Sequence, residues 1–133
     1  MSRLIRDALL VVTRTLPAAN ANNNSTSIDL GDVTSILHGQ NHELSLEMPA
    51  LPSLANATTA TVTVQDSADD SDFAAIPSLA TLVVTGGGGV GSAAATRVVR
   101  LPSTVRRYIR VNVAVANSGG DNTARTFTFR ILS

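Results

Sequence analysis

The chain has 133 residues, with ten arginines, no lysine and ten acidic residues, so its formal net charge is zero. One domain is expected at this length, and the absence of cysteine excludes disulfides, thiol nucleophiles and cysteine-based metal sites. A neutral chain lacks the positive field that gathers phosphates, which argues against nucleic-acid binding. Aromatic residues make up 3% of the chain, so the core is light, and contacts with other subunits are expected to supply part of the stability.

The first 24 residues differ in pattern from the rest and are predicted to form an arm. They lead from an apolar segment through Pro17 into alanine–asparagine repeats, a polar run that does not suit a core. A short amphipathic helix over 4–12 is an alternative for the apolar part. A signal peptide is rejected because the apolar run 8–12 has five residues, whereas such regions need about 7–15. No stretch approaches the roughly 20 apolar residues of a membrane span, so we expect no membrane partner.

From residue 25 onward, apolar and polar residues alternate as they do in β-strands. Strands are expected at 27–30, 42–48, 59–65, 79–85, 96–101, 108–116 and 126–132. The segment 79–85 is continuously apolar, which is typical of a strand buried on both faces. Turn-forming residues separate these segments. The pattern predicts an all-β, two-sheet sandwich of the jelly-roll type over residues 25–133, with an extended N-terminal arm over residues 1–24.

A glycine run follows the predicted strand 79–85. Gly86, Gly88 and Gly91 satisfy the G-x-G-x-x-G spacing of a dinucleotide-binding loop. Such a loop must open a helix, but only about ten residues precede Pro102, and the last of them are β-like. No acidic residue stands near the position that would bind the ribose. The run is therefore predicted to be a mobile hairpin loop, and no nucleotide cofactor is expected.

An acidic turn carries the sequence DSADDSD at residues 66–72. Clustered carboxylates suit hard cations, but an EF-hand loop needs an oxygen ligand where Ala68 stands, a glycine at Ser71 and a glutamate at Pro77. That kind of calcium site is excluded, and the turn is expected to be a solvated cap on two strand ends. The sequence leaves open whether an ion binds there in another way.

No combination of residues points to catalysis. His38 and His42 are the only histidines, and with Glu43 they do not form H-E-x-x-H. No serine lies in G-x-S-x-G, and no acid is paired with a base. We therefore expect no enzyme activity, no catalytic or metal-binding residue, no cofactor and no small-molecule substrate.

A basic cluster is predicted around the strands 96–101 and 108–116, formed by Arg97, Arg100, Arg106, Arg107 and Arg110. It lacks the interleaved aromatic residues that stack nucleic-acid bases. We expect the acidic turns, or an acidic patch on a neighbour, to pair with it. Arginine without lysine suits surfaces that become covered, because guanidinium is weakly hydrated and pairs bidentately with carboxylates; codon bias is the alternative.

The apolar patch of the arm would be unfavourable in water, so a partner surface is expected to cover it. The candidate contacts with a partner protein or a neighbouring subunit come from this arm and from the basic cluster. They are Arg3, Leu4, Ile5, Arg6, Leu9, Leu10, Arg14, Arg106, Arg107 and Arg110.

Several segments together resemble the capsid cement, or decoration, proteins of tailed bacteriophages, and the jelly-roll type of short-tailed phage heads in particular. These segments are the DSADDSDF turn (66–73), the R-x-x-R-L-P step (97–102), the RRYIRV strand (106–111) and the GGDNTARTFTF ending (119–129). The resemblance covers residues 27–133. It carries no catalytic or cofactor residue, and no interface residue is transferred by it.

The resemblance implies a structural protein on the outer capsid surface of a virion, assembled in the host cytoplasm, that bridges capsomers and resists internal DNA pressure. Its partners would be the major capsid protein and further copies of itself, with a dimer expected before a trimer. A tail or baseplate β-sandwich is an alternative. A carbohydrate-binding module is a weaker one, since sugar platforms usually need exposed tryptophan or tyrosine.

Overall fold

A computed structural model describes residues 11–29, 43–76, 79, 81–102, 105–116 and 119–132. Over these residues the chain forms β-strands and no helix. In chain order the strands are β1 (Val11–Thr15), β2 (Ala21–Asn24), β3 (Ile28–Asp29), β4 (Glu43–Met48), β5 (Thr59–Ser67), β6 (Ala74–Ala75), β7 (Leu82–Thr85), β8 (Ala95–Arg100), β9 (Tyr108–Val115) and β10 (Thr126–Leu132). The predicted all-β class is confirmed.

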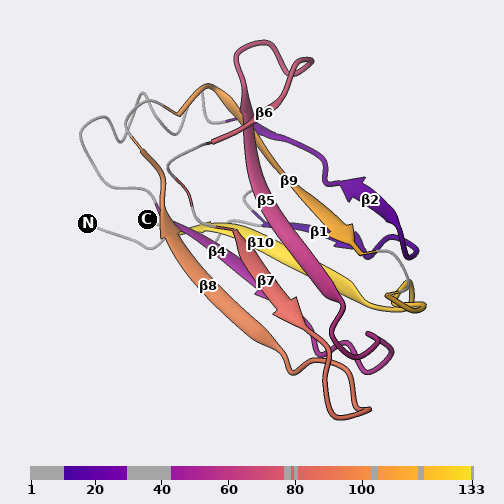
Figure 1. The fold of residues 1–133 in the computed structure, drawn as a ribbon. Coiled ribbons are helices and arrows are strands. Elements are labelled where there is room, and N and C mark those ends of the chain that lie inside the picture. Colours follow the sequence, from indigo (N-terminus) through magenta and orange to yellow (C-terminus); the bar gives the residue numbers. More distant parts are fainter. Residues whose placement is uncertain are drawn as a thin grey trace.

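The strands form two antiparallel sheets that pack against each other (Figure 1). One sheet, sheet A, has the order β1-β10-β4-β8, and the other, sheet B, has the order β2-β9-β5-β6. In sheet B, β3 continues the β2 edge along β9, and β7 continues the β6 edge along β5. If β2 and β3 are counted as one position, and β6 and β7 as another, the strands occupy eight positions. Numbered along the chain, their order is 1-8-3-6 in sheet A and 2-7-4-5 in sheet B. This is the strand order of a jelly roll, so the predicted sandwich is confirmed.

The core lies between the sheets and follows from the alternation of side chains along each strand. In β10, Phe127, Phe129 and Ile131 are buried at 1% exposure or less, whereas Thr128 and Arg130 are on the other face. In β9 the valines and isoleucine at every second position from Ile109 to Val115 are buried in the same way. The two phenylalanines of β10 are the largest fully buried side chains, and aliphatic residues supply the rest of the core.

The predicted boundary between arm and domain at residue 25 is wrong for the described part of the arm. Residues 11–15 form β1 and pair with β10, and residues 21–24 form β2 and pair with β9. Leu16, between them, is a core residue at 1% exposure. The polar repeat suits an edge strand because Asn112 Nδ2 donates to Oδ1 of Asn22 and of Asn24, at 3.0 and 2.8 Å. Residues 1–10 lie outside the described residues.

Two further expectations are corrected in the segment 82–94. The strand β7 is not buried on both faces, because it lies at the edge of sheet B with Leu82 and Val84 inward and Val83 47% exposed. The glycine run after it is not a hairpin, because β7 belongs to sheet B and β8 to sheet A. The run is instead a crossing from one sheet to the other, and hydrogen bonds to a neighbouring loop hold it in place.

Candidate functional site

Four of the ten predicted contact residues lie in the described part of the chain. Arg14 is exposed on the edge strand β1, and Arg106, Arg107 and Arg110 lie at the start of β9 or just before it. The other six, which are Arg3, Leu4, Ile5, Arg6, Leu9 and Leu10, lie outside the described residues. Of the four described contact residues, the three arginines near β9 lie in one region of the structure.

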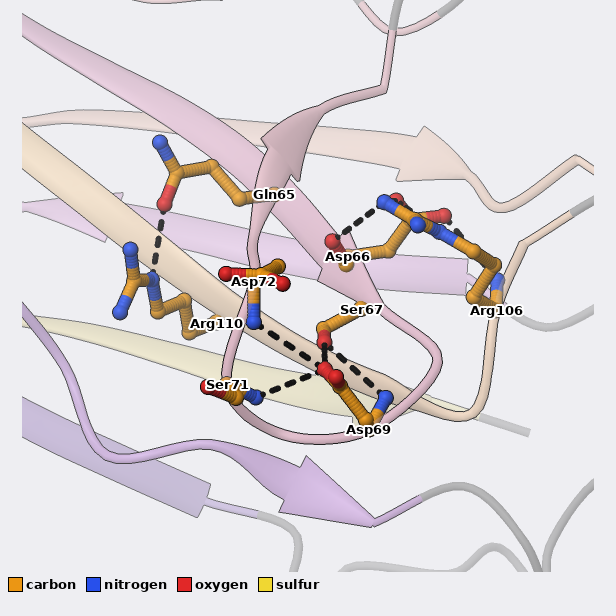
Figure 2. A network of polar contacts seen from close by, with 8 residues as sticks. All are labelled: Gln65, Asp66, Ser67, Asp69, Ser71, Asp72, Arg106 and Arg110. Atoms are coloured by element: carbon orange, nitrogen blue, oxygen red, sulfur yellow. Dashed lines mark hydrogen bonds and ion pairs between the residues drawn. The ribbon is translucent and has the colours of Figure 1, made fainter.

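Arg106 clamps the end of β5 through a nearly buried carboxylate (Figure 2). The Asp66 side chain is 10% exposed and accepts hydrogen bonds from Arg106 Nε at 3.0 Å, from Nη2 at 2.8 Å and from the Arg106 backbone N–H at 3.0 Å. Arg106 Nη2 also donates to the Asp66 carbonyl at 2.8 Å. These hydrogen bonds raise the pKa of Arg106 above its ordinary value. A buried carboxylate needs such a partner, so this arginine is used within the chain.

The acidic turn is held by one carboxylate, as Figure 2 also shows. Asp69 Oδ1 accepts from Ser67 Oγ at 2.9 Å and from the backbone N–H groups of Ser71 and Asp72 at 3.0 and 3.1 Å. The bond from Asp72 is the main cause that lowers the pKa of Asp69. These contacts form the expected turn, which lies between the end of β5 and the start of β6. Among the residues that the structure describes, no group of three or more His, Cys, Asp or Glu side chains is placed to hold a metal ion.

Arg107 and Arg110 also make contacts within the chain. Arg107 forms a bidentate pair with Asp29 of β3, with Nε–Oδ1 at 2.8 Å and Nη2–Oδ2 at 2.9 Å. Arg110 Nε donates to Gln65 Oε1 of β5 at 2.8 Å, and its guanidinium lies 4.1 Å from the centre of the Phe73 ring. These contacts tie β3 and the acidic turn to β9. The expected pairing of the basic cluster with an acidic turn is found for Arg106, whereas Arg107 pairs with Asp29 of β3.

The outer face of sheet A carries paired charges. Arg130 Nε lies 2.8 Å from Glu47 Oε2, and Arg130 Nη2 donates a hydrogen bond to Glu47 Oε1 at 3.5 Å. Arg100 Nη2 lies 3.8 Å from Glu43 Oε2, where both side chains are exposed. Pairs of this kind contribute little to stability in water. They leave a face whose charges largely balance.

The opposite end of the sandwich from the acidic turn is formed by four loops, which we call the loop end: residues 16–20, 49–58, 86–94 and 119–125. These loops lie at the lower right of Figure 1. The first three contain no charged residue, and the fourth contains Asp121 and Arg125. Asp121 is engaged in its own turn, where bonds from the Thr123 hydroxyl and N–H lower its pKa.

Backbone hydrogen bonds join the four loops to one another. Leu16 N–H donates to the Arg125 carbonyl at 2.9 Å, and Ala55 N–H donates to the Gly119 carbonyl at 3.3 Å. Leu51 and Ser92 exchange two bonds, at 2.9 and 3.0 Å. The glycine run is fixed by bonds from Ala57 to Gly86 and by Gly89 N–H, which donates to Asn56 Oδ1 at 2.9 Å. The predicted mobile loop is therefore bonded to its neighbour at both ends.

Large apolar side chains are exposed at three described positions, each on a different surface. Val83 (47%) lies on the outer face of sheet B, Val98 (51%) on that of sheet A, and Val90 (74%) at the tip of the glycine run. Sequence patterns suggested the arginines but missed these valines and the loop end. The lack of charge in 49–58 and 86–94 is the signal that was available, and only the fold shows that the two segments meet.

A comparison with known proteins finds one protein family, and its match covers nearly all of this fold. No curated protein gives a significant match to the chain. Over the described residues, no helix is long and apolar enough to cross a membrane. The model of one protein family, Bbp16, matches residues 11–131, which include β1 through β9 and most of β10. The chain therefore belongs to the Bbp16 family, which is a bacteriophage-type family.

Proposed function

We propose that the chain is a structural virion protein that binds the outer surface of a phage capsid and stabilises the shell by bridging capsomers. The observation that carries this proposal is membership of a phage-type family over the whole described jelly roll. The proposed partners are the major capsid protein and other copies of the chain, with a dimer before a trimer.

A small sandwich suits this role because binding to a lattice is multivalent. Each copy that touches two or three capsomers makes its later contacts intramolecular, which increases avidity by about 10²–10⁴ without any new kind of contact. Weak individual contacts are then sufficient. A chain with zero net charge also avoids repulsion between many copies placed side by side.

Binding to capsids tests the proposal directly. Purified protein is mixed with expanded empty capsids of the phage that encodes it, and separately with purified tails, and each mixture is sedimented. We expect the protein to pellet with capsids at a fixed saturating ratio and to raise the temperature at which they rupture. Pelleting with tails alone would instead support the alternative, a tail or baseplate sandwich. Pelleting with neither would contradict both.

A further inference from the structure

Each of the two edges of sheet A is formed by one continuous strand. Among the described residues, β1 pairs with β10 alone and β8 pairs with β4 alone. Alternate backbone N–H and C=O groups of an edge strand face outward, where they can pair with a strand of another chain. One such group is used within the chain, because Asn23 Nδ2 donates to the Thr15 carbonyl at 3.0 Å. That bond covers only one end of β1.

Both edge strands have a composition that favours pairing. The sequence of β1 is VVTRT and that of β8 is ATRVVR. Valine and threonine favour strands, and neither strand contains a proline that would interrupt a ladder of hydrogen bonds. Val98 of β8 is also 51% exposed. Without some form of protection, both edges would therefore be suited to pairing with a second copy of the chain.

The register of each edge strand places one arginine on the side of the sheet that faces the core. Arg14 pairs with Phe127, and Arg97 pairs with Leu46. Residues directly opposite each other in an antiparallel pair project from the same face of the sheet, and Phe127 and Leu46 are core residues at 1% exposure. Both arginines are nevertheless exposed. Each side chain therefore starts on the inner face and extends past the edge of the sandwich into water.

These two arginines differ from every other residue at an inward position of the described strands. Their guanidinium groups make no ion pair or hydrogen bond with a described residue. The remaining inward positions of sheet A are apolar. In sheet B, Asp66 also projects inward, opposite Ile109, but Arg106 binds its carboxylate. The unpaired inward charges of the described strands are thus one on each edge of sheet A.

The edges of sheet B are built differently. Each is divided between two strands, β2 and β3 along β9, and β6 and β7 along β5. These strands have two to four residues, whereas β1 has five and β8 has six. Very short edge strands offer few outward groups and are themselves a protection against pairing. The inward residues of β2 are Ala21 and Asn23, and those of β7 are Leu82 and Val84, none of which is charged. Inward arginines occur on the two longer edges.

We infer that Arg14 and Arg97 prevent the two edges of sheet A from pairing with a second copy of the chain. A sandwich joined to β1 or β8 edge to edge would continue the core across the contact and cover the inward arginine with apolar surface. Burial of a charge without a partner is costly, and inward-pointing charges protect edge strands for this reason. The inference does not rest on the proposed function. It directs any contact between copies to surfaces other than these two edges.

Three substitutions in β8 test the inference. Arg97→Val removes the inward charge and keeps a residue that suits a strand. Arg100→Val removes the same charge from the outward face of β8, where Arg100 lies opposite Glu43. Arg97→Glu keeps a charge at the inward position and reverses its sign. The full-length variants are compared by sedimentation over a series of concentrations, and their folding is checked by circular dichroism. We expect Arg97→Val to associate at a concentration at least tenfold below that of the wild type, and the other two variants to sediment as the wild type does.

Hydrogen exchange shows where the copies meet. In associated Arg97→Val, the backbone amides of β8 that face away from β4 should exchange more slowly than in the dilute variant. Arg14→Val is the corresponding variant for β1 and should slow the exchange of the β1 amides that face away from β10. The double variant opens both edges, so that β1 of one copy can pair with β8 of the next. Such a head-to-tail contact need not close, and we expect open-ended chains.

The inference is wrong if Arg97→Val sediments as the wild type does at every concentration. It is also wrong if Arg100→Val or Arg97→Glu associates equally, because the inward charge would then not be the cause, or if association leaves exchange in β8 unchanged. If Arg97→Val does not fold, the same comparison is decided by Arg14→Val, with Arg125→Val as the control at an exposed loop arginine. Capsid binding is not measured in these experiments, so the proposed function can fail without affecting their result.

Discussion

The replacement Leu16→Ala distinguishes a core residue from part of a separate arm. Leu16 follows β1, is 1% exposed, and its N–H donates to the Arg125 carbonyl at 2.9 Å. Truncation of a buried leucine removes apolar contacts and leaves a cavity, at a cost of about 2–5 kcal/mol. The cost within this range depends on how far the surroundings close over the cavity, and Leu16 lies in the loop end rather than at the centre of a strand. We therefore expect about 2–3 kcal/mol, a large fraction of a total stability of about 5–15 kcal/mol.

The assay is urea unfolding followed by circular dichroism, with calorimetry for the melting temperature. For a domain of this size each kcal/mol is worth roughly 3–5 °C, so the melting temperature should fall by about 6–15 °C. Val90→Ala is the control, since Val90 is 74% exposed and its truncation should change stability by less than about 0.5 kcal/mol. Equal urea midpoints for Leu16→Ala and the wild type would refute the assignment of residues 11–24 to the sandwich.

Three further predictions concern the glycine run, the acidic turn and the N-terminal segment. Gly91→Ala should destabilise the fold by more than about 1–2 kcal/mol in urea unfolding, because φ is +76° and a Cβ would meet the Leu51 and Pro52 backbone. The control Gly87→Ala should change stability little, and equal effects of the two substitutions would contradict this account of the loop. The lowered pKa of Asp69 means that its contribution to stability is present above the ordinary value of 3.8 and is lost as the pH falls through the lower folded value. Asp69→Asn should therefore flatten the dependence of stability on pH below about pH 4, and an unchanged acid limb would show that the turn contributes nothing there. Deletion of residues 1–20 removes β1 and Leu16, so it should unfold the domain, seen as loss of the β signal in circular dichroism. Deletion of 1–10, which removes six of the predicted contacts, should keep the fold and weaken capsid binding; unchanged binding would show that those six contribute nothing.

The strands β5, β9 and β10 could be predicted because buried and outward residues alternate along them, whereas the two-residue strand β6 was not expected. In β10, Phe127, Phe129 and Ile131 are inward as the alternation required, and the predicted bounds 126–132 match the strand. The class and the sandwich follow from such segments. In β7 the apolar run concealed an edge position, since Val83 points outward from a strand that pairs on one side only.

The N-terminal strands could not be predicted because their pairing is long-range. Asn22 and Asn24 look unsuited to a strand until Asn112, far along the chain, supplies the amide that binds both. The partners of the candidate contact residues could not be predicted for the same reason. The basic cluster was visible in sequence, but its partners Asp66, Asp29 and Gln65 are set by the register of β5 and β3 against β9. The loop end is likewise a product of topology, since its four loops are separated along the sequence.

The claim that this jelly roll is a capsid-surface protein is tested most directly by cryo-electron microscopy of the mature phage particle. The account predicts density for the two-sheet sandwich on the outside of the shell, over the junctions between capsomers. Density for the sandwich in the tail or baseplate, or a shell with no such density outside it, would contradict the account.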